Sequence, residues 1–215
     1  MTPLVVVLSS PSGGGKSSIT QRVLSEREDC GYSVSATTRA ARPGEVDGTA
    51  YNFLSPEEFE RRVQAGEFLE HAVYNGHRYG TLVEEVRRVT HGGRHVLLDI
   101  EVVGARGVRE RFPDAVLIFV VPPSGAVLAG RLRARGTEAE AVVAGRLEKA
   151  LEELAAAVEY DYVVVNDALE EAVRAVHAIL DAEARRTSRQ RDVFFLLDRL
   201  RTEVAAELAR SSAHR

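Results

Sequence analysis

The run Ser10-Pro11-Ser12-Gly13-Gly14-Gly15-Lys16-Ser17 has residue types and spacing that suit phosphate chemistry. It follows an apolar segment, residues 4–8, and opens a predicted helix, which is the context that a phosphate-binding loop requires. Glycines let successive backbone N–H groups turn toward one anion, and the helix adds the positive end of its dipole. Lys16 would reach the β- and γ-phosphates, and Ser17 would ligate Mg²⁺. The loop therefore predicts an ATP site with Mg²⁺ as cofactor.

The entry of this loop departs from the usual pattern, because Ser10 stands where the first glycine normally lies. A residue with a side chain must therefore accept the backbone geometry there. We expect tolerance, because the three glycines closest to Lys16 remain. The predicted ATP contacts in the loop and helix start are Ser12, Gly13, Gly14, Gly15, Lys16, Ser17 and Ser18.

Short apolar runs predict the strands that position the loop. They are residues 4–8, 96–100, 115–121 and 162–165. Such runs are typical of strands buried on both faces of a parallel sheet. Helical patterns lie between them, and the one at 138–158 has Val143, Leu147, Leu151 and Leu154 at spacings of three and four. This alternation predicts an α/β fold, with a P-loop NTPase-type parallel sheet flanked by helices.

Two segments depart from this alternation, and the chain ends in a third feature. Residues 32–90, with a polar, arginine-bearing start, predict an inserted substrate subdomain. An arginine-dense segment after Pro123 predicts a mobile helical lid, with Gly130 and Gly136 as candidate hinges. The tail predicts an amphipathic helix that packs on the body or on a second subunit, which would make a homo-oligomer. Its apolar stripe is Val193, Leu197, Leu200, Val204 and Leu208.

Composition limits the classes of partner. The 215 residues are 45% hydrophobic and carry a formal net charge of -4, which fits one globular unit and favours neither nucleic acid nor an anionic membrane. Cys30 is the only cysteine, which excludes an internal disulfide or a thiolate zinc site and suits a reducing compartment. The N-terminus has no basic leader, and no apolar run is long enough to span a bilayer. We therefore expect a cytoplasmic location and no membrane partner.

The loop alone leaves the phosphoryl acceptor open, since water, a hydroxyl or another phosphate would suit it. Further stretches narrow the choice: SVSATTRAARPGEVDGTAYNF (33–53), GEFLEHAVYNGHRYGT (66–81), LLDIEVVGA (97–105), VVPPSGAVLAGRLRARGTEAE (120–140) and EYDYVVVND (159–167). They resemble the guanylate kinase family over about residues 4 to 190. The resemblance implies a nucleoside monophosphate kinase that transfers the γ-phosphoryl group of ATP to GMP, and also to dGMP.

The acceptor chemistry agrees with this resemblance. The phosphate of GMP is a dianion, and Arg39 and Arg42 are suitable bidentate donors for it. The hydroxyls of Tyr51 and Tyr79 complete the cradle. These four residues form the predicted phosphate side of the GMP site.

Guanine presents N1–H and N2–H₂ as adjacent donors that one carboxylate accepts together, whereas N1 of adenine is an acceptor. The resemblance gives this guanine-reading role to Glu70. It also implies that the hydroxyls of Ser35 and Thr81 face O6 and N7 of guanine.

The motif at 97–105 departs from the family at two positions. Relatives usually read Asp-Ile-Asp, a variable residue, Gln, Gly and Ala, whereas this chain has Glu101 and Val103 in place of the second Asp and the Gln. Glu101 keeps a carboxylate one methylene farther out, so its implied guanine contact requires a small shift. Val103 loses any hydrogen bond of the amide. Asp99, at the end of a buried strand, is predicted to orient the waters of Mg²⁺.

Arginines in the lid suit the transfer step, which needs two anions in line and their charge neutralised. By resemblance, Arg131 and Arg135 contact ATP phosphates, and Arg146 lies between the donor and acceptor phosphates. Arg133 is attributed to a solvated helix face. The resemblance also puts Asn166 at the adenine pocket. The predicted catalytic set is Lys16, Arg39, Arg135 and Arg146.

The resemblance divides the chain into a guanylate-kinase-like domain, 1–190, and the C-terminal helix, 191–215. Within the domain we expect a core (1–32, 91–124 and 158–190), a GMP-binding insert (33–90) and a lid (125–157).

Two other functions remain open. One is a ribose-bisphosphate kinase on the same scaffold, against which Glu70 and Ser35 argue. The other is a phosphopeptide-binding module without catalysis, against which the intact Lys16, Ser17 and Asp99 argue. The sequence does not decide the preference between GMP and dGMP.

Overall fold

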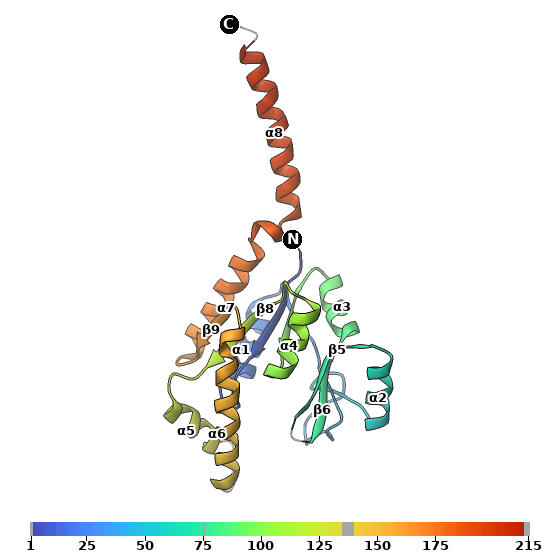
Figure 1. The fold of residues 1–215 in the computed structure, drawn as a ribbon, viewed down its shortest axis with the longest axis vertical. Coiled ribbons are helices and arrows are strands. Elements are labelled where there is room, and N and C mark those ends of the chain that lie inside the picture. Colours follow the sequence, from blue (N-terminus) through green and yellow to red (C-terminus); the bar gives the residue numbers. More distant parts are fainter. Residues whose placement is uncertain (1, 75, 135–139, 213–215) are drawn as a thin grey trace.

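A parallel sheet forms the centre of the computed structural model, which describes residues 2–74, 76–134 and 140–212 (Figure 1). The strand order is β2 (Cys30–Tyr32), β7 (His95–Asp99), β1 (Val5–Ser9), β8 (Val116–Val121) and β9 (Tyr162–Val165). All neighbouring strands pair in parallel, which confirms the predicted α/β class. Their carboxyl ends therefore meet at one edge, where Ser9 and Asp99 end neighbouring strands.

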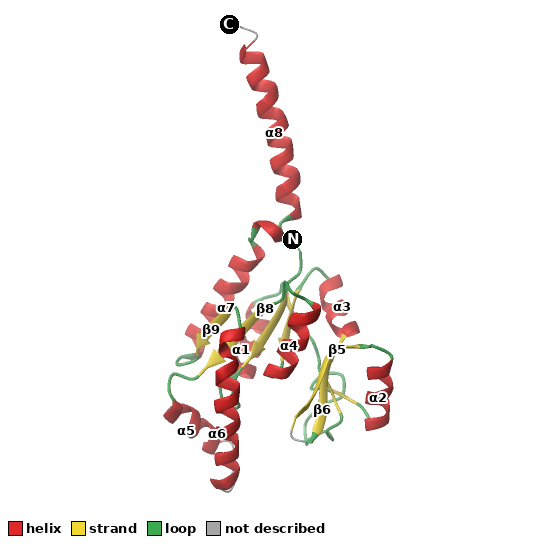
Figure 2. Ribbon diagram, in the orientation of Figure 1, coloured by secondary structure: helices red, strands yellow, loops and turns green. Residues whose placement is uncertain are grey.

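Helices cover both faces of this sheet (Figure 2). Val6 and Val7 are fully buried and point to opposite faces, because side chains alternate along a strand. Val6 belongs to a cluster with α1 (Lys16–Glu26) and α7 (Leu169–Ala184). Val7 belongs to a cluster with α3 (Val83–His91) and α4 (Val102–Arg111). The sheet edge is thus fixed by packing from both sides.

The insert forms a second sheet in the order β4 (Asn52–Phe53), β3 (Ala36–Thr37), β6 (His77–Leu82) and β5 (Phe68–Tyr74). Helix α2 (Pro56–Gln64) begins where the Ser55 side chain accepts a hydrogen bond from the Glu58 N–H, at 3.1 Å. Its Phe59 is fully buried and stacks on Phe68 at 4.3 Å between ring centroids. The insert therefore has a small core of its own.

The predicted lid segment contains α5 (Gly125–Ala134) and α6 (Glu140–Ala155), followed by the short 3₁₀ helix η1 (Ala156–Glu159). The apolar stripe predicted for α6 needs one correction: Leu151 is 69% exposed, and Ala150 packs against α5 in its place. Gly130 lies within α5, whereas Gly136 lies outside the described residues.

After η2 (Thr187–Arg189), helix α8 (Arg191–Ser212) projects from the body (Figure 1). Its apolar side chains are exposed, including Phe195 at 77%. Packing of α8 on the body, one of the two predicted arrangements, is therefore not observed. Within the described part of the chain, every helix is too short or too polar to cross a membrane.

Strand β9 differs from the prediction of burial on both faces. Val163 and Val165 are each 53% exposed, whereas Val164 is buried. The reason is that β9 is the last strand of the sheet and only its α7 side is covered. Strand β2 was not predicted, because its three residues give too short a pattern.

Packing of the insert predicts a stability difference between two variants. Phe59→Ala should lower the free energy of unfolding by about 3–5 kcal/mol, because it removes a fully buried ring from a small core. Val46→Ala is the control, since Val46 is in the same insert but 62% exposed, and it should change little. Urea denaturation measures both. Equal effects would contradict this packing.

Candidate active site

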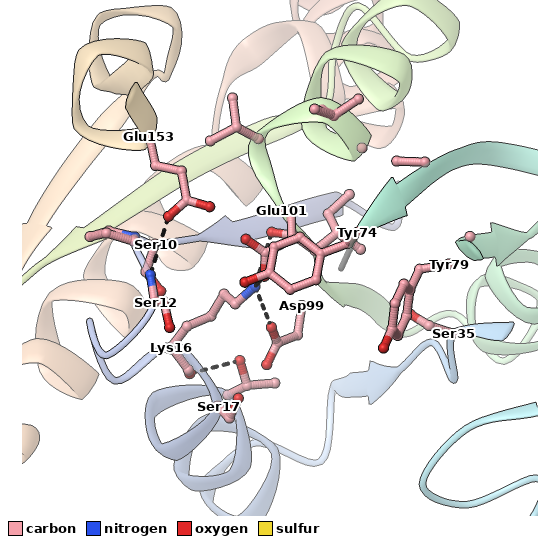
Figure 3. A pocket seen from close by; sticks show the side chains of 18 of the residues that line it. Ser10, Ser12, Lys16, Ser17, Ser35, Tyr74, Tyr79, Asp99, Glu101 and Glu153 are labelled. Carbon is pink, nitrogen blue, oxygen red and sulfur yellow. Dashed lines mark hydrogen bonds and ion pairs between the residues drawn. The ribbon is translucent and has the colours of Figure 1, made fainter. Parts of the chain in front are cut away.

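A cleft of about 890 Å³ opens at the carboxyl edge of the parallel sheet, between the loop after β1, the insert and α6 (Figure 3). It brings together the predicted donor and acceptor halves of the site. The predicted residues that line it are Ser12, Gly13, Gly15, Lys16, Ser17, Ser35, Arg42, Tyr51, Glu70, Tyr79, Asp99 and Glu101.

The loop between β1 and α1 has the backbone that its glycines allow. Gly13 and Gly15 have φ angles of 86° and 94°, in the left-handed region, and the Gly14 N–H donates to the Pro11 carbonyl at 2.8 Å. Ser10 is buried at the entry. A Cβ on residue 14 would lie 2.8 Å from the Cβ of Ser10. The loop therefore accommodates Ser10 because residue 14 has no side chain.

Lys16 is held by carboxylates at the end of β7. Its Nζ lies 2.7 Å from Asp99 and 3.4 Å from Glu101, and it donates to the Ile100 carbonyl at 3.1 Å. Burial alone would lower the pKa of Lys16, but these two carboxylates raise it, and the net shift is upward. Lys16 is therefore a cation in the cleft. Glu101, for which a guanine contact is predicted, faces this lysine because its longer side chain reaches it.

Glu70, on β5, is a buried carboxylate at the acceptor end of the cleft. It is 8% exposed and accepts a hydrogen bond from the Thr81 hydroxyl at 2.6 Å. Burial raises the pKa of Glu70, and hydrogen bonds from Thr81 partly oppose the rise. A Cβ at Gly104, on α4, would lie 2.6 Å from Glu70 Oε2, so a side chain at residue 104 would displace this carboxylate.

Thr81 lies behind Glu70 rather than on the cleft surface. It is fully buried and its hydroxyl points to Glu70, so it does not line the cleft in the described structure. Ser35, by contrast, does line it. Thr81 therefore orients the Glu70 carboxylate, and its contact with guanine stays a prediction.

The predicted phosphate side of the acceptor site is organised by Glu45. One oxygen of Glu45 accepts from the Arg39 guanidinium at 2.9 Å, and the other accepts from the Arg42 N–H at 2.7 Å. Arg39 does not line the cleft in the described structure, whereas Arg42 does. Tyr51 and Tyr79 line it as an edge-to-face pair, with ring centroids 5.9 Å apart.

One arginine of the predicted lid, Arg131, contacts the phosphate loop. Arg131 donates to the Asn166 carbonyl at 3.0 Å and to the Gly14 carbonyl at 3.4 Å, and the Asn166 amide donates to Gly14 as well, at 2.9 Å. Arg146 is half-buried on α6. Arg135 lies outside the described residues. Ser18 is exposed on α1 and is not among the described residues that line the cleft.

Tyr74, Lys149 and Glu153 are among the cleft residues that sequence reasoning missed. The Lys149 Nζ lies 3.2 Å from the centroid of the Tyr74 ring, on β5, and Glu153 accepts from the Ser12 N–H at 3.2 Å. Burial raises the pKa of Tyr74 to about 12, an effect that Lys16 and Arg146 oppose, so these cations act on the same part of the cleft. The available signal was the spacing of Arg146, Lys149 and Glu153, which puts them on one face of α6.

The donor chemistry of the cleft suits Mg²⁺. Ser17 and Asp99 offer hydroxyl and carboxylate oxygens, which this ion prefers, and it commonly completes its shell with water and phosphate oxygens. No group of three or more His, Cys, Asp or Glu residues suited to a metal occurs in the part of the chain that the structure describes.

Fold and site together define a class. A phosphate loop with a carboxylate-held lysine shares a cleft with a buried carboxylate and a phosphate-binding insert, as expected of a P-loop kinase that phosphorylates nucleotides.

Comparisons with known proteins specify the family. The sequence profile of guanylate kinase matches residues 2–183. The chain is 52% identical to the guanylate kinase of Symbiobacterium thermophilum, over 86% of this chain and 88% of that one, and 46% identical to that of Lactococcus lactis, over 86% and 91%. The crystal structure of the Anaplasma phagocytophilum guanylate kinase superposes with a TM-score of 0.76 at 36% identity, covering 92% of this chain and 94% of that one. The chain belongs to the guanylate kinase family.

The buried charge of Glu70 predicts a pH-dependent stability difference. Since the pKa of Glu70 is raised on folding, its ionised form opposes folding once the pH exceeds that pKa. Glu70→Gln should therefore unfold at a higher temperature than the wild type at neutral pH, and the gap should close as the pH falls toward the unfolded pKa, near 4.5. Glu28→Gln, at an exposed position, is the control. Thermal unfolding across this pH range measures the gap, and a gap that widens on acidification would contradict the assignment.

Proposed function

We propose that this chain transfers the γ-phosphoryl group of ATP to GMP, giving ADP and GDP, through the residues described above. The observation that carries the proposal is that Lys16, on the phosphate loop, and Glu70, a buried carboxylate of the insert, line one cleft. The loop suits a triphosphate, and the carboxylate suits the paired N–H donors of guanine. Both substrates can therefore be bound in the same cleft at the same time.

On the donor side, the N–H groups from Ser12 to Ser17 and the Lys16 ammonium would hold the phosphates of ATP. Ser17 and Asp99 would hold Mg²⁺, directly and through water. The ion supplies charge neutralisation on the phosphate oxygens. Arg131 and Asn166 would border the nucleotide, which their hydrogen bonds to Gly14 support.

On the acceptor side, Glu70 would accept N1–H and N2–H₂ of guanine, and Ser35 would meet its other edge. Arg39, Arg42, Tyr51 and Tyr79 would bind the GMP phosphate, for which Arg39 must exchange Glu45 for that phosphate. We assign Glu101 to Lys16 rather than to guanine, because the 3.4 Å contact supports this pairing.

Transfer needs the two phosphates in line and the migrating charge neutralised. Arg146 on α6, together with Arg135, would supply the neutralising positive charge when the lid closes. Lys16 would follow the γ-phosphoryl group. Closure would also exclude water, so that ATP is not hydrolysed. Turnover of dGMP, self-association through α8 and a cytoplasmic location stay predictions from the sequence.

A coupled assay of ADP release tests this function with Mg-ATP and, in turn, GMP, dGMP, AMP, CMP and UMP. Wild-type protein should turn over with the guanine nucleotides only. Lys16→Ala should lose turnover by about 10³-fold or more, and Glu70→Gln should lower kcat/KM for GMP by at least about 10²-fold, because a buried guanine donor loses its acceptor. Glu28→Gln is the control and should match the wild type. Absence of GMP-dependent turnover in folded wild-type protein would refute the proposal.

A further inference from the structure

Glu153 has no part in the reaction as described, yet its carboxylate lies on the phosphate loop. Its Oε2 accepts a hydrogen bond from the Ser12 N–H at 3.2 Å, and the residue is only 6% exposed (Figure 3). Backbone N–H groups of such a loop are the donors that bind nucleotide phosphates. A protein carboxylate therefore occupies one N–H donor of the proposed ATP site.

The Glu153 carboxylate lies near one cation, Lys149, and one further carboxylate, Glu101. Lys149, one turn earlier on α6, has its Nζ 4.0 Å from Glu153 Oε1. Burial, together with the like charge of Glu101 at the start of α4, raises the pKa of Glu153 to about 7. Glu101 in turn contacts Lys16 of α1, at 3.4 Å. An arriving phosphate would add further negative charge to this group.

We propose that Glu153 is a further residue of the ATP site, one that opposes binding: it occupies the Ser12 N–H until the polyphosphate of ATP displaces it. This inference rests on the proposed ATP site. Displacement requires the Glu153 carboxylate to leave the loop, and movement of α6, the helix that carries Glu153, would achieve this. Lys149 lies on the same face and contacts Tyr74 of the insert, so movement of α6 links phosphate occupancy to the GMP side.

The test is titration calorimetry of ATP and of adenosine with the wild type, Glu153→Gln and Glu148→Gln. Glu153→Gln keeps the shape of the side chain and removes its charge. It should bind ATP about fivefold more tightly than the wild type, because a like charge at about 4 Å from phosphate is lost. Adenosine affinity should not change, since adenosine carries no phosphate. Glu148→Gln, exposed on the same helix, is the matched control and should bind ATP as the wild type does.

Other outcomes would overturn the inference. If Glu153 supports the loop rather than competing with phosphate, Glu153→Gln and Glu153→Ala would bind ATP more weakly, and the inference would be wrong. An equal gain in ATP affinity in Glu148→Gln would show that the effect comes from the general charge of α6. An equal gain in adenosine affinity in Glu153→Gln would exclude competition with phosphate. Failure of the wild type to bind ATP would refute the proposed function itself, and the wild-type titration alone reveals it.

Discussion

The contact between Lys16 and Asp99 is the interaction on which the rest of the site depends. It joins the start of α1 to the end of β7, at 2.7 Å and with both side chains largely buried. Its geometry follows from strand register, because Leu8 of β1 pairs with Asp99 of β7 and the loop must return to this edge. Removing one partner of such a buried pair costs about 3–5 kcal/mol, since the other charge is left without a partner. The sheet thereby fixes a cation where the proposed function puts the phosphates of ATP.

Several cationic or N–H groups in or beside the cleft are paired with a carboxylate of the protein. Asp99 and Glu101 face Lys16, Glu45 holds Arg39 and the Arg42 N–H, and Glu153 holds the Ser12 N–H. These carboxylates orient the donors before substrate arrives. In the proposed function, Glu45 and Glu153 would also limit affinity, because an incoming phosphate would have to replace them. A kinase must release ADP and GDP after transfer, and moderate phosphate affinity favours that release.

Local features of the site could be predicted from the sequence. The phosphate loop is contiguous, and strand β1, the loop and α1 follow one another along the chain. Residue type and order are therefore enough to predict this part of the site. The roles of Lys149 and Glu153 depend on how α6 docks across the cleft, which a helical pattern does not encode. For the same reason Leu151 was assigned to the buried face, although neighbouring Ala150 occupies it. The exposure of Val163 and Val165 follows from the place of β9 at the sheet edge, which depends on the strand order of the whole domain.

The central claim is that one cleft binds ATP through Lys16 and GMP through Glu70 at the same time. Binding of a single molecule in which a polyphosphate chain joins adenosine to guanosine tests it most directly. The wild type should bind this molecule far more tightly than ATP or GMP alone, because the second half binds at high effective concentration. The advantage should fall in both Lys16→Ala and Glu70→Gln. Affinity no greater than that of ATP, or no dependence on Glu70, would contradict the account.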